Sequence, residues 1–494
     1  VNKYMSDPAS VEPPYLIGMT CGFCHIGMNP LNPPKDPENP RWQNLAPAIG
    51  NQYFKEGTLF SLKLNPKDFR WHVADKQPPG TSDTSRFATD HIFNPNAINS
   101  IVHLAARPSH MEKQADGSVR PVHHILKDGA DSIGTAGASL RVYVNIGMCS
   151  DYWTTLHDPI RGIKMKQQPF RIDLARKDCP DWSATEARME GAEAFLKTIL
   201  PARLKDAPGG ERHLSGDAAQ MRQGALVFAE QCAKCHSSKQ PPAELTSENA
   251  RIEWFRQAVG KPDFLDDNFL SNDLRYPVHE IGTNIGRAIA SNAVEGHVWA
   301  EFSSRSYKEL PAAAELKGLY NPVNPGKPIN FQPPSGGRGY YRVPTLAGVW
   351  ATAPYFHNNA LGNFNGDPSV EGRIAAFEDA MVKLLWPERR LGVFSVWTTS
   401  EDSELPQESG YRLKIRRGTP VNLIANINAP ELQLLRNDNF FTRFIGWLIG
   451  RGRLYNTLLK RNLSPDFVVD RGHTFGSQLS DDDKRALIAY VKSL

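Results

Sequence analysis

The sequence predicts a mainly α-helical protein whose helices are joined by long irregular loops. The 494 residues include 38 prolines and 38 glycines, which interrupt regular structure and favour extended connections. Two stretches, 215–235 and 480–494, nevertheless repeat apolar residues at the three- and four-residue intervals of an amphipathic helix. A chain of this length is able to bury the cores of two or three domains.

The composition excludes several classes of protein. It is 40% hydrophobic and 22% charged with a formal net charge of +4, and no basic stripe indicates a nucleic-acid partner. The most apolar stretch, 440–459, is interrupted by three arginines and falls short of the about 18 residues of a membrane span, so we expect no transmembrane segment. The sequence begins at a valine without a basic and apolar leader, so we expect a processed chain that has lost a secretion signal.

Four of the six cysteines fall in two strings with the pattern Cys-x-x-Cys-His. These strings consist of Cys21, Cys24 and His25, and of Cys232, Cys235 and His236. Two thiols one helical turn apart can reach the two vinyl groups of one porphyrin, while the next residue offers an imidazole to the iron. The histidine that follows each pair favours haem over a redox dithiol or half of a zinc site. We therefore predict two covalently bound haem c groups, with His25 and His236 as iron ligands.

Haem is attached to this motif outside the cytoplasm, so we expect a periplasmic or secreted protein. The two remaining cysteines, Cys149 and Cys179, are about thirty residues apart. In an oxidising compartment such a pair usually closes a disulfide. Two buried free thiols are the alternative.

The two amphipathic stretches suggest how the domains are built. The first leads into the second haem motif, and the second has Ser480 as its N-cap and acidic residues in its first turn. A helix carrying the haem motif, crossed by a C-terminal helix, is the core of a class I cytochrome c domain. We therefore expect two class I cytochrome c-like haem domains, 1–205 and 206–494, the second with a large insertion. The stretch 204–217 would be the linker, and 184–200 is the clearest helix of the first domain.

A sixth ligand is apparent for only one of the two irons. His473 lies eight residues before the C-terminal helix, where class I cytochromes place the distal ligand. Gly472 and Gly476 would let its loop pass close to a porphyrin. Ligation by His236 and His473 would give a six-coordinate, low-spin iron suited to electron storage. The alternative is a histidine in a surface loop.

The first haem has no comparable second ligand. The histidines of its domain stand in Pro-rich or charged stretches, which are more typical of structural or exposed positions; they are His72, His91, His103, His110, His123, His124 and His157. We therefore predict a five-coordinate or weakly ligated first iron, which is the condition for binding dioxygen or hydrogen peroxide.

The segment 345–364, TLAGVWATAPYFHNNALGNF, resembles a signature of the bacterial di-haem cytochrome c peroxidases and MauG-like enzymes. That signature reads T-L-x-x-V-x-x-T-x-P-Y-x-H-[DN]. Its histidine lies near the haems without necessarily binding iron, so the resemblance implies that His357 is a candidate catalytic residue. A plain Pro-rich loop is the alternative interpretation.

A closer resemblance, over most of the chain, is to the extracellular di-haem rubber oxygenases (RoxA-like). It is carried by CGFCH with the following NPLNPPKDPENPRWQN, GTSDTS at 80–85, NPNAINSI at 94–101, RVYVNIG at 141–147 and the closing GHTFG before the last helix. The spacing of 211 residues between the two haem histidines is also similar. The resemblance implies that His25 is the proximal ligand of an oxygen-binding haem, and that His236 and His473 both bind the second.

The same family lines its oxygen-binding pocket with aromatic side chains. The corresponding part of this chain offers Tyr143, Tyr152 and Trp153, and we take Trp153 as the candidate catalytic residue. The implied reaction uses dioxygen to cleave carbon–carbon double bonds of a polyisoprenoid, a hydrophobic polymer, or of a smaller organic substrate.

Two other functions remain open. In a peroxidase the first haem would react with hydrogen peroxide and take electrons from a donor protein; in an electron-transfer cytochrome both irons would be six-coordinate. An acid–base group beside the first haem would favour the peroxidase, and an apolar pocket the oxygenase. The apolar stretch 439–450 is either a buried helix or a surface that docks a hydrophobic polymer.

Overall fold

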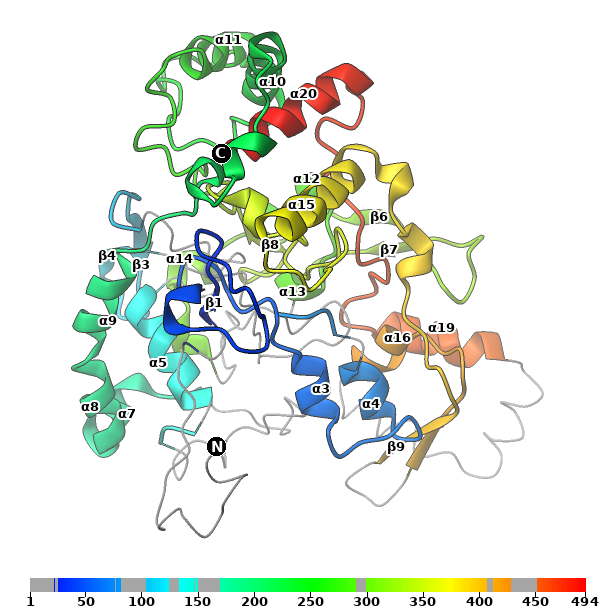
Figure 1. The fold of residues 1–494 in the computed structure, drawn as a ribbon. Coiled ribbons are helices and arrows are strands. Elements are labelled where there is room, and N and C mark those ends of the chain that lie inside the picture. Colours follow the sequence, from blue (N-terminus) through cyan, green and yellow to red (C-terminus); the bar gives the residue numbers. More distant parts are fainter. Residues whose placement is uncertain are drawn as a thin grey trace.

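The computed structural model describes residues 22, 25–75, 77–80, 104–123, 133–145, 147–149, 169–289, 299–406, 412–427 and 451–494. This part of the chain consists of helices joined by irregular segments, with five small antiparallel sheets of two strands each (Figure 1). Within these residues no helix has both the length and the apolar character needed to cross a membrane. Cys21, Cys24, Trp153 and the stretch 439–450 lie outside the described residues.

The α-helices are distributed along the whole described chain. They are α3 (Glu56–Ser61), α4 (Phe69–Ala74), α5 (Thr135–Asn145), α7 (Ile172–Asp178), α8 (Pro180–Glu186), α9 (Met189–Leu196), α10 (Ala218–Gln231), α11 (Glu248–Val259), α12 (Val278–Ile281), α13 (Gly286–Ile289), α14 (Arg305–Lys308), α15 (Val370–Leu385), α16 (Val421–Ala425), α19 (Arg451–Arg461) and α20 (Asp481–Lys492). The strand pairs are β1 (Gly27–Met28) with β2 (Leu45–Ala46), β3 (His110–Lys113) with β4 (Val119–Val122), β5 (Arg275–Pro277) with β8 (Tyr340–Arg342), β6 (Leu316–Leu319) with β7 (Ile329–Phe331), and β9 (Ser403–Pro406) with β10 (Arg412–Ile415).

Helices α10 and α20 begin at strong N-caps. The side chain of Asp217 accepts hydrogen bonds from the backbone N–H groups of Ala219 and Gln220 at the start of α10. The Ser480 hydroxyl accepts one from the N–H of Asp483 at the start of α20. The predicted cap at Ser480 is therefore confirmed, and each cap satisfies backbone donors that a helix end leaves unpaired.

The two helices cross in close contact at the top of Figure 1, α10 in green and α20 in red. A Cβ atom on Gly224 would overlap the carbonyl oxygen of Ala486, so only glycine allows the backbones to come this close. Beside this point, the rings of Phe228 and Tyr490 pack with their centroids 5.4 Å apart. The crossing buries one face of both helices in the largest hydrophobic cluster of the described residues.

The predicted disulfide between Cys149 and Cys179 is confirmed, with a Cα–Cα distance of 5.9 Å. It lies in a separate hydrophobic cluster with Phe170, Trp182 and Trp299. The prediction of one helix over 184–200 is wrong, because this segment contains the end of α8 and the whole of α9.

The break between α8 and α9 comes from a local change in hydrogen bonding. The N–H of Arg188 bonds to the carbonyl of Thr185, three residues back, which tightens the last turn and ends α8. Neither proline nor glycine stands at this break, so the sequence pattern did not indicate it.

The stretch expected to be a linker, 204–217, packs against the rest of the protein. Leu204 is only 1% exposed and belongs to the largest hydrophobic cluster. Just before it, the carbonyl of Ala202 accepts a hydrogen bond from Trp350 Nε1 at 2.8 Å. These contacts hold the residues of the expected domain boundary against the core. The division into domains 1–205 and 206–494 stays a prediction.

A buried ionic cluster also joins the two parts of the chain. Arg107 donates to the Asp273 carboxylate through Nε at 2.9 Å and through Nη2, and Arg342 donates to the Asp273 carbonyl. All three residues are almost fully buried. Nearby, Arg275 pairs with Glu112 on β3, so two ion pairs connect the segment 104–123 to the sheet of β5 and β8.

Candidate functional site

The second Cys-x-x-Cys-His motif directly follows α10. Cys232 is the C-cap of the helix, and its carbonyl accepts hydrogen bonds from the N–H groups of Cys235 and His236 at 3.1 and 2.8 Å. This tight turn brings both thiols and the imidazole to the end of one helix. Burial, together with a smaller effect of the neighbouring His473, lowers the pKa of His236 to about 3. The imidazole is therefore neutral at neutral pH, which is the form that binds a metal.

His473 faces His236, with their ring centroids 6.3 Å apart and their planes at 54°. An imidazole nitrogen binds a transition metal at about 2.0–2.1 Å, and the ring centroid lies about 1.1 Å behind the nitrogen, so two opposite ligands place their centroids about 6.3 Å apart. The Nδ1 atoms of both rings are buried and have no hydrogen-bond partner within the described part of the chain. The spacing and the chemistry of these two residues fit a single iron held between them.

The loop that carries His473 is held against the segment 281–285. The N–H of His473 donates to the carbonyl of Ile281 at 2.8 Å. Gly472, at φ +81°, lies so close to Gly282 that a Cβ atom there would overlap the Gly282 backbone. His473 itself has φ +46°, a conformation that non-glycine residues adopt at a cost and only where the surroundings enforce it.

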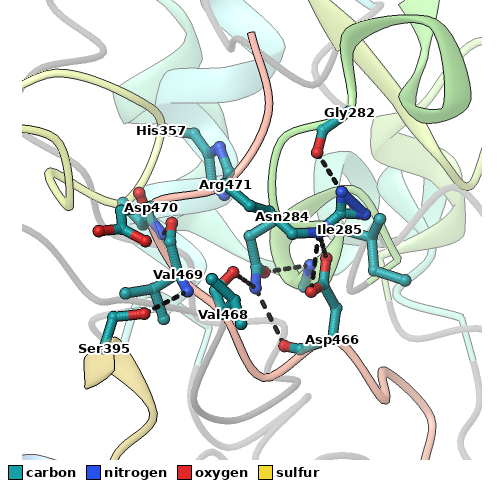
Figure 2. Close-up of polar contacts among 12 residues, drawn as sticks. Gly282, Asn284, Ile285, His357, Ser395, Asp466, Val468, Val469, Asp470 and Arg471 are labelled. Atoms are coloured by element: carbon teal, nitrogen blue, oxygen red, sulfur yellow. Dashed lines mark hydrogen bonds and ion pairs between the residues drawn. The ribbon is translucent and has the colours of Figure 1, made fainter. Parts of the chain in front are cut away.

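Polar side chains fix the same loop, as Figure 2 shows. Asn284 Nδ2 donates to the carbonyls of Asp466 and Val468 at 3.0 and 3.1 Å. Arg471 bonds the Asp466 carboxylate through Nε at 3.0 Å and also donates to the carbonyl of Gly282. Because Asp466 is fully buried, its pKa is raised despite the neighbouring Arg471. Asp466 and Arg471 lie seven and two residues before His473, so this network fixes the course of the chain that leads to His473.

Aromatic side chains surround the His473 ring. Phe356 and Phe475 lie with their centroids 6.3 and 5.2 Å from it. The guanidinium of Arg390 lies over the Phe356 ring and donates to the carbonyl of Gly472 at 2.6 Å. Phe356 precedes His357, so the signature segment of the sequence contacts His473.

His357 is buried against Tyr341 and is not one of the two facing imidazoles. The rings stack with centroids 4.6 Å apart, and the Tyr341 hydroxyl lies 3.2 Å from His357 Nε2. The same hydroxyl donates to the carbonyl of Asn284 at 2.7 Å. His357 therefore lies beside the network that holds the His473 loop, and its catalytic role stays a prediction.

The first haem motif is described at His25, whose pKa burial lowers to about 4. Immediately after it, β1 pairs with β2 and lines an open hollow of about 390 Å³. Most side chains of this hollow are apolar, and its lining is Ile26, Gly27, Met28, Pro40, Leu45, Asn51, Tyr53, Phe54 and Lys55. Neither a carboxylate nor an imidazole is among these described lining residues.

The signature segment also reaches this N-terminal region. Gln52 Nε2 donates to the carbonyl of Ala353 at 3.0 Å, and Asn359 Nδ2 donates to that of Pro79 at 3.2 Å. The ring of Phe364 packs edge-on against Tyr53, a residue of the hollow, with centroids 5.2 Å apart. One short segment thus contacts both the hollow beside His25 and the aromatic shell of His473.

The other residues proposed for the first pocket are not brought together by the described structure. Tyr143 lies on α5 and packs against the disulfide cluster. Tyr152 and Trp153, like Cys21 and Cys24, lie outside the described residues. His72 Nε2 lies 2.7 Å from the Pro66 carbonyl, and His123 Nε2 lies 3.2 Å from the Ser109 hydroxyl, both ordinary structural contacts.

The sequence analysis missed Arg373 on α15. This residue is 4% exposed and joins the chain just after the first haem motif to the signature segment through hydrogen bonds. A signal was present, because a helix over 370–385 places Arg373 one turn from Phe377 on its apolar face. A charge in that position indicates a buried guanidinium with partners.

Comparison with known proteins gives one family match. Residues 339–364 match the model of the RoxA-like, cytochrome c-like family. The matched segment covers Tyr341, Phe356 and His357, and thus the contacts to both halves of the site. No curated protein matches the chain. This match relates the chain to RoxA-like, cytochrome c-like proteins and is consistent with a haem-dependent oxidoreductase. A cytochrome c-like segment implies covalently bound haem c and suggests a place outside the cytoplasm.

Proposed function

We propose that this protein is an extracytoplasmic di-haem c-type dioxygenase that cleaves carbon–carbon double bonds of a polyisoprenoid. The active haem is attached at Cys21 and Cys24 with His25 as ligand. The second is attached at Cys232 and Cys235 and held by His236 and His473. The match of residues 339–364 to the RoxA-like family and the 6.3 Å spacing of the two facing imidazoles support this arrangement.

We further propose that α10 and α20 form the core of a class I cytochrome c domain over 206–494, with residues 1–205 forming the other haem domain. The close crossing at Gly224 supports the first of these assignments. The segment between the two helices is then the large insertion.

The observation that carries the choice of reaction is the hollow beside His25. A peroxidase needs a group that moves protons while the O–O bond of peroxide breaks. Most lining side chains are apolar, and the polar ones are Asn51, Tyr53 and Lys55. No carboxylate or imidazole, the groups that most often move these protons, is among the described lining residues. Such a mostly apolar surface can accommodate a hydrocarbon chain, which favours the oxygenase.

Haem bound at this position supplies the iron chemistry that binds dioxygen and exchanges electrons. His25 is neutral at neutral pH because burial lowers its pKa to about 4, so its lone pair is available to the iron. The apolar lining would hold the double bond in place. One dioxygen molecule is consumed, both carbon–carbon bonds of the alkene break, and each carbon receives one oxygen atom as an aldehyde or ketone. No external reductant is needed.

The test measures dioxygen uptake by the purified holoprotein with an unsaturated polyisoprenoid and, as a control, its hydrogenated analogue. We expect uptake with the unsaturated substrate alone and products with aldehyde and ketone ends. Leu45→Trp should narrow the hollow and reduce the rate several-fold, while Leu62→Trp, at an exposed position outside the hollow, should not. Trp153→Ala should alter the rate or the product lengths with both haems retained.

Two results would replace this proposal. Consumption of hydrogen peroxide with an electron-donor protein, without dioxygen uptake, would indicate a peroxidase that acts together with His357. Two six-coordinate haems inert to both oxidants would indicate an electron-transfer cytochrome.

A further inference from the structure

Arg373 connects three distant segments through one buried guanidinium. Nη2 donates to the carbonyl of Met28 at 2.8 Å. Nη1 donates to the carbonyl of Ala351 at 2.7 Å and to Gln52 Oε1 at 3.2 Å, and Nε donates to the carbonyl of Pro368 at 3.3 Å. The residue thereby fixes the chain after the first haem motif to the signature segment.

All of these acceptors are neutral carbonyl or amide oxygens. Within the described part of the chain, Arg373 makes no hydrogen bond or ion pair with a carboxylate. Burial lowers its pKa, and Tyr53 and Asp367 act in the opposite direction without cancelling that effect. The Asp367 carboxylate instead accepts the N–H of Ser369 at 2.9 Å. Within the described residues, the Arg373 guanidinium is thus a buried positive charge that carbonyl and amide dipoles solvate and that no carboxylate contacts directly.

This charge lies close to the first haem motif. Met28 is the third residue after His25, so their Cα atoms are at most about 11 Å apart. Solvent screens a buried charge far less than an exposed one, so its field extends over such a distance. A ferrous haem carries one positive charge less than a ferric haem, and a nearby cation therefore favours the reduced state.

We propose that Arg373 is a positioning residue for the first haem whose charge raises the reduction potential of that haem. The proposal rests on haem attachment at His25 under the proposed function, and it adds that a helix of the C-terminal part sets the redox state of the N-terminal iron. Retention of the ferrous form is what dioxygen binding requires, so the effect serves the proposed reaction.

The experiment compares the reduction potentials of the two haems in the full-length holoprotein by spectroelectrochemistry at pH 8. In Gln52→Glu, the new carboxylate has nearly the shape of the amide and stands 3.2 Å from the guanidinium, where it would ionise and neutralise the charge. We expect a negative shift in the reduction potential of one haem and no change in the reduction potential of the other. Arg373→Gln should shift the same haem in the same direction.

Arg212→Gln is the matched control, because Arg212 is exposed and pairs with Glu371 at the start of the same helix. Solvent screens that charge, so neither potential should move. Two results for Gln52→Glu would overturn the proposal, whatever the Arg373 variant shows. Either both reduction potentials stay unchanged, or the reduction potentials of both haems shift equally. Intact mass is measured first, because a protein carrying a single haem would refute the di-haem assignment rather than the role of Arg373.

Discussion

His473 shows at the scale of one residue how a fold selects a ligand. Its left-handed backbone, the close approach of Gly472 to Gly282 and the bond to the Ile281 carbonyl all fix the direction of one side chain. Such a conformation costs of order 1–3 kcal/mol and persists only where contacts enforce it. We infer that the surrounding contacts impose this unfavourable conformation on His473 because it directs the imidazole toward His236.

The first prediction concerns this residue. Under the proposed ligation, His473→Ala should convert the haem of His236 from low-spin to high-spin, because the described residues offer no second strong ligand opposite His236. Optical and EPR spectra of the holoprotein measure the change. Phe475→Leu, which alters a ring packed on His473 without removing the ligand, should keep the low-spin spectrum. An unchanged low-spin spectrum in His473→Ala would point to another side chain, with His357 the first to examine.

The two Cys-x-x-Cys-His motifs and the candidate ligand His473 can be identified from residues close together in the sequence, and haem attachment at them stays a prediction. Arg373 was not predicted, since its partners Met28 and Gln52 lie more than 300 residues away and nothing local identifies them. The same holds for the contacts of His357 with Tyr341, which follow from packing alone. Local sequence patterns therefore point to candidate attachment residues, whereas the surroundings of each site follow from tertiary contacts that the sequence does not reveal.

Gly224 sets the distance between α10 and α20 at the scale of helices. A methyl group on it would meet the Ala486 carbonyl, and overpacking of this kind typically costs about 1–3 kcal/mol. We predict that Gly224→Ala lowers the free energy of unfolding by that amount in urea denaturation. Gly191→Ala is the control: it lies within α9 with nothing within 4 Å of the added atom, and it should raise stability by up to about 1 kcal/mol. Equal effects of both substitutions would mean that the crossing is not close-packed.

At this scale the sequence analysis was right where local signals agreed. The helix leading to Cys232 and the last helix both combine an apolar face with a capping side chain, Asp217 and Ser480. The single helix expected over 184–200 was wrong because the turn at Arg188 depends on hydrogen bonding that leaves no mark in the composition. The packing of the expected linker was likewise not apparent, since the burial of Leu204 is a tertiary contact.

The buried cluster around Asp273 joins distant parts of the whole molecule. Burial raises the pKa of this carboxyl, but the nearby His110, the hydrogen bonds and charge of Arg107 and the charge of Arg342 outweigh burial and hold the pKa well below its usual range. A carboxyl with a depressed folded-state pKa stabilises the protein above its unfolded pKa, and this contribution is lost as the pH falls. The link between 104–123 and the sheet of β5 and β8 should therefore weaken in acid.

We predict that Asp273→Asn lowers the free energy of unfolding at pH 7 by about 3–5 kcal/mol, because it leaves buried guanidinium groups without their carboxylate. Urea denaturation at pH 7 and pH 2.5 measures the loss, because the contribution of Asp273 disappears only below its ordinary pKa of 3.8. The variant should lose less free energy of unfolding between these two pH values than the wild type. Asp116→Asn removes an exposed partner of Arg120 and should change nothing measurable. If both variants unfold like the wild type, the cluster does not hold the two parts together.

The α10–α20 crossing has a further consequence for the order of events during synthesis. Gln223 and Asp483, whose side chains bond across it at 2.7 Å, are 260 residues apart in the chain. Closing so long a loop is slow and costs chain entropy before any contact forms. We expect Cys232 and Cys235, at the end of α10, to stay accessible to the machinery that attaches haem until the last helix has been made. Long separation between two helices that pack together thus leaves time for a covalent modification to precede the closure of its own pocket.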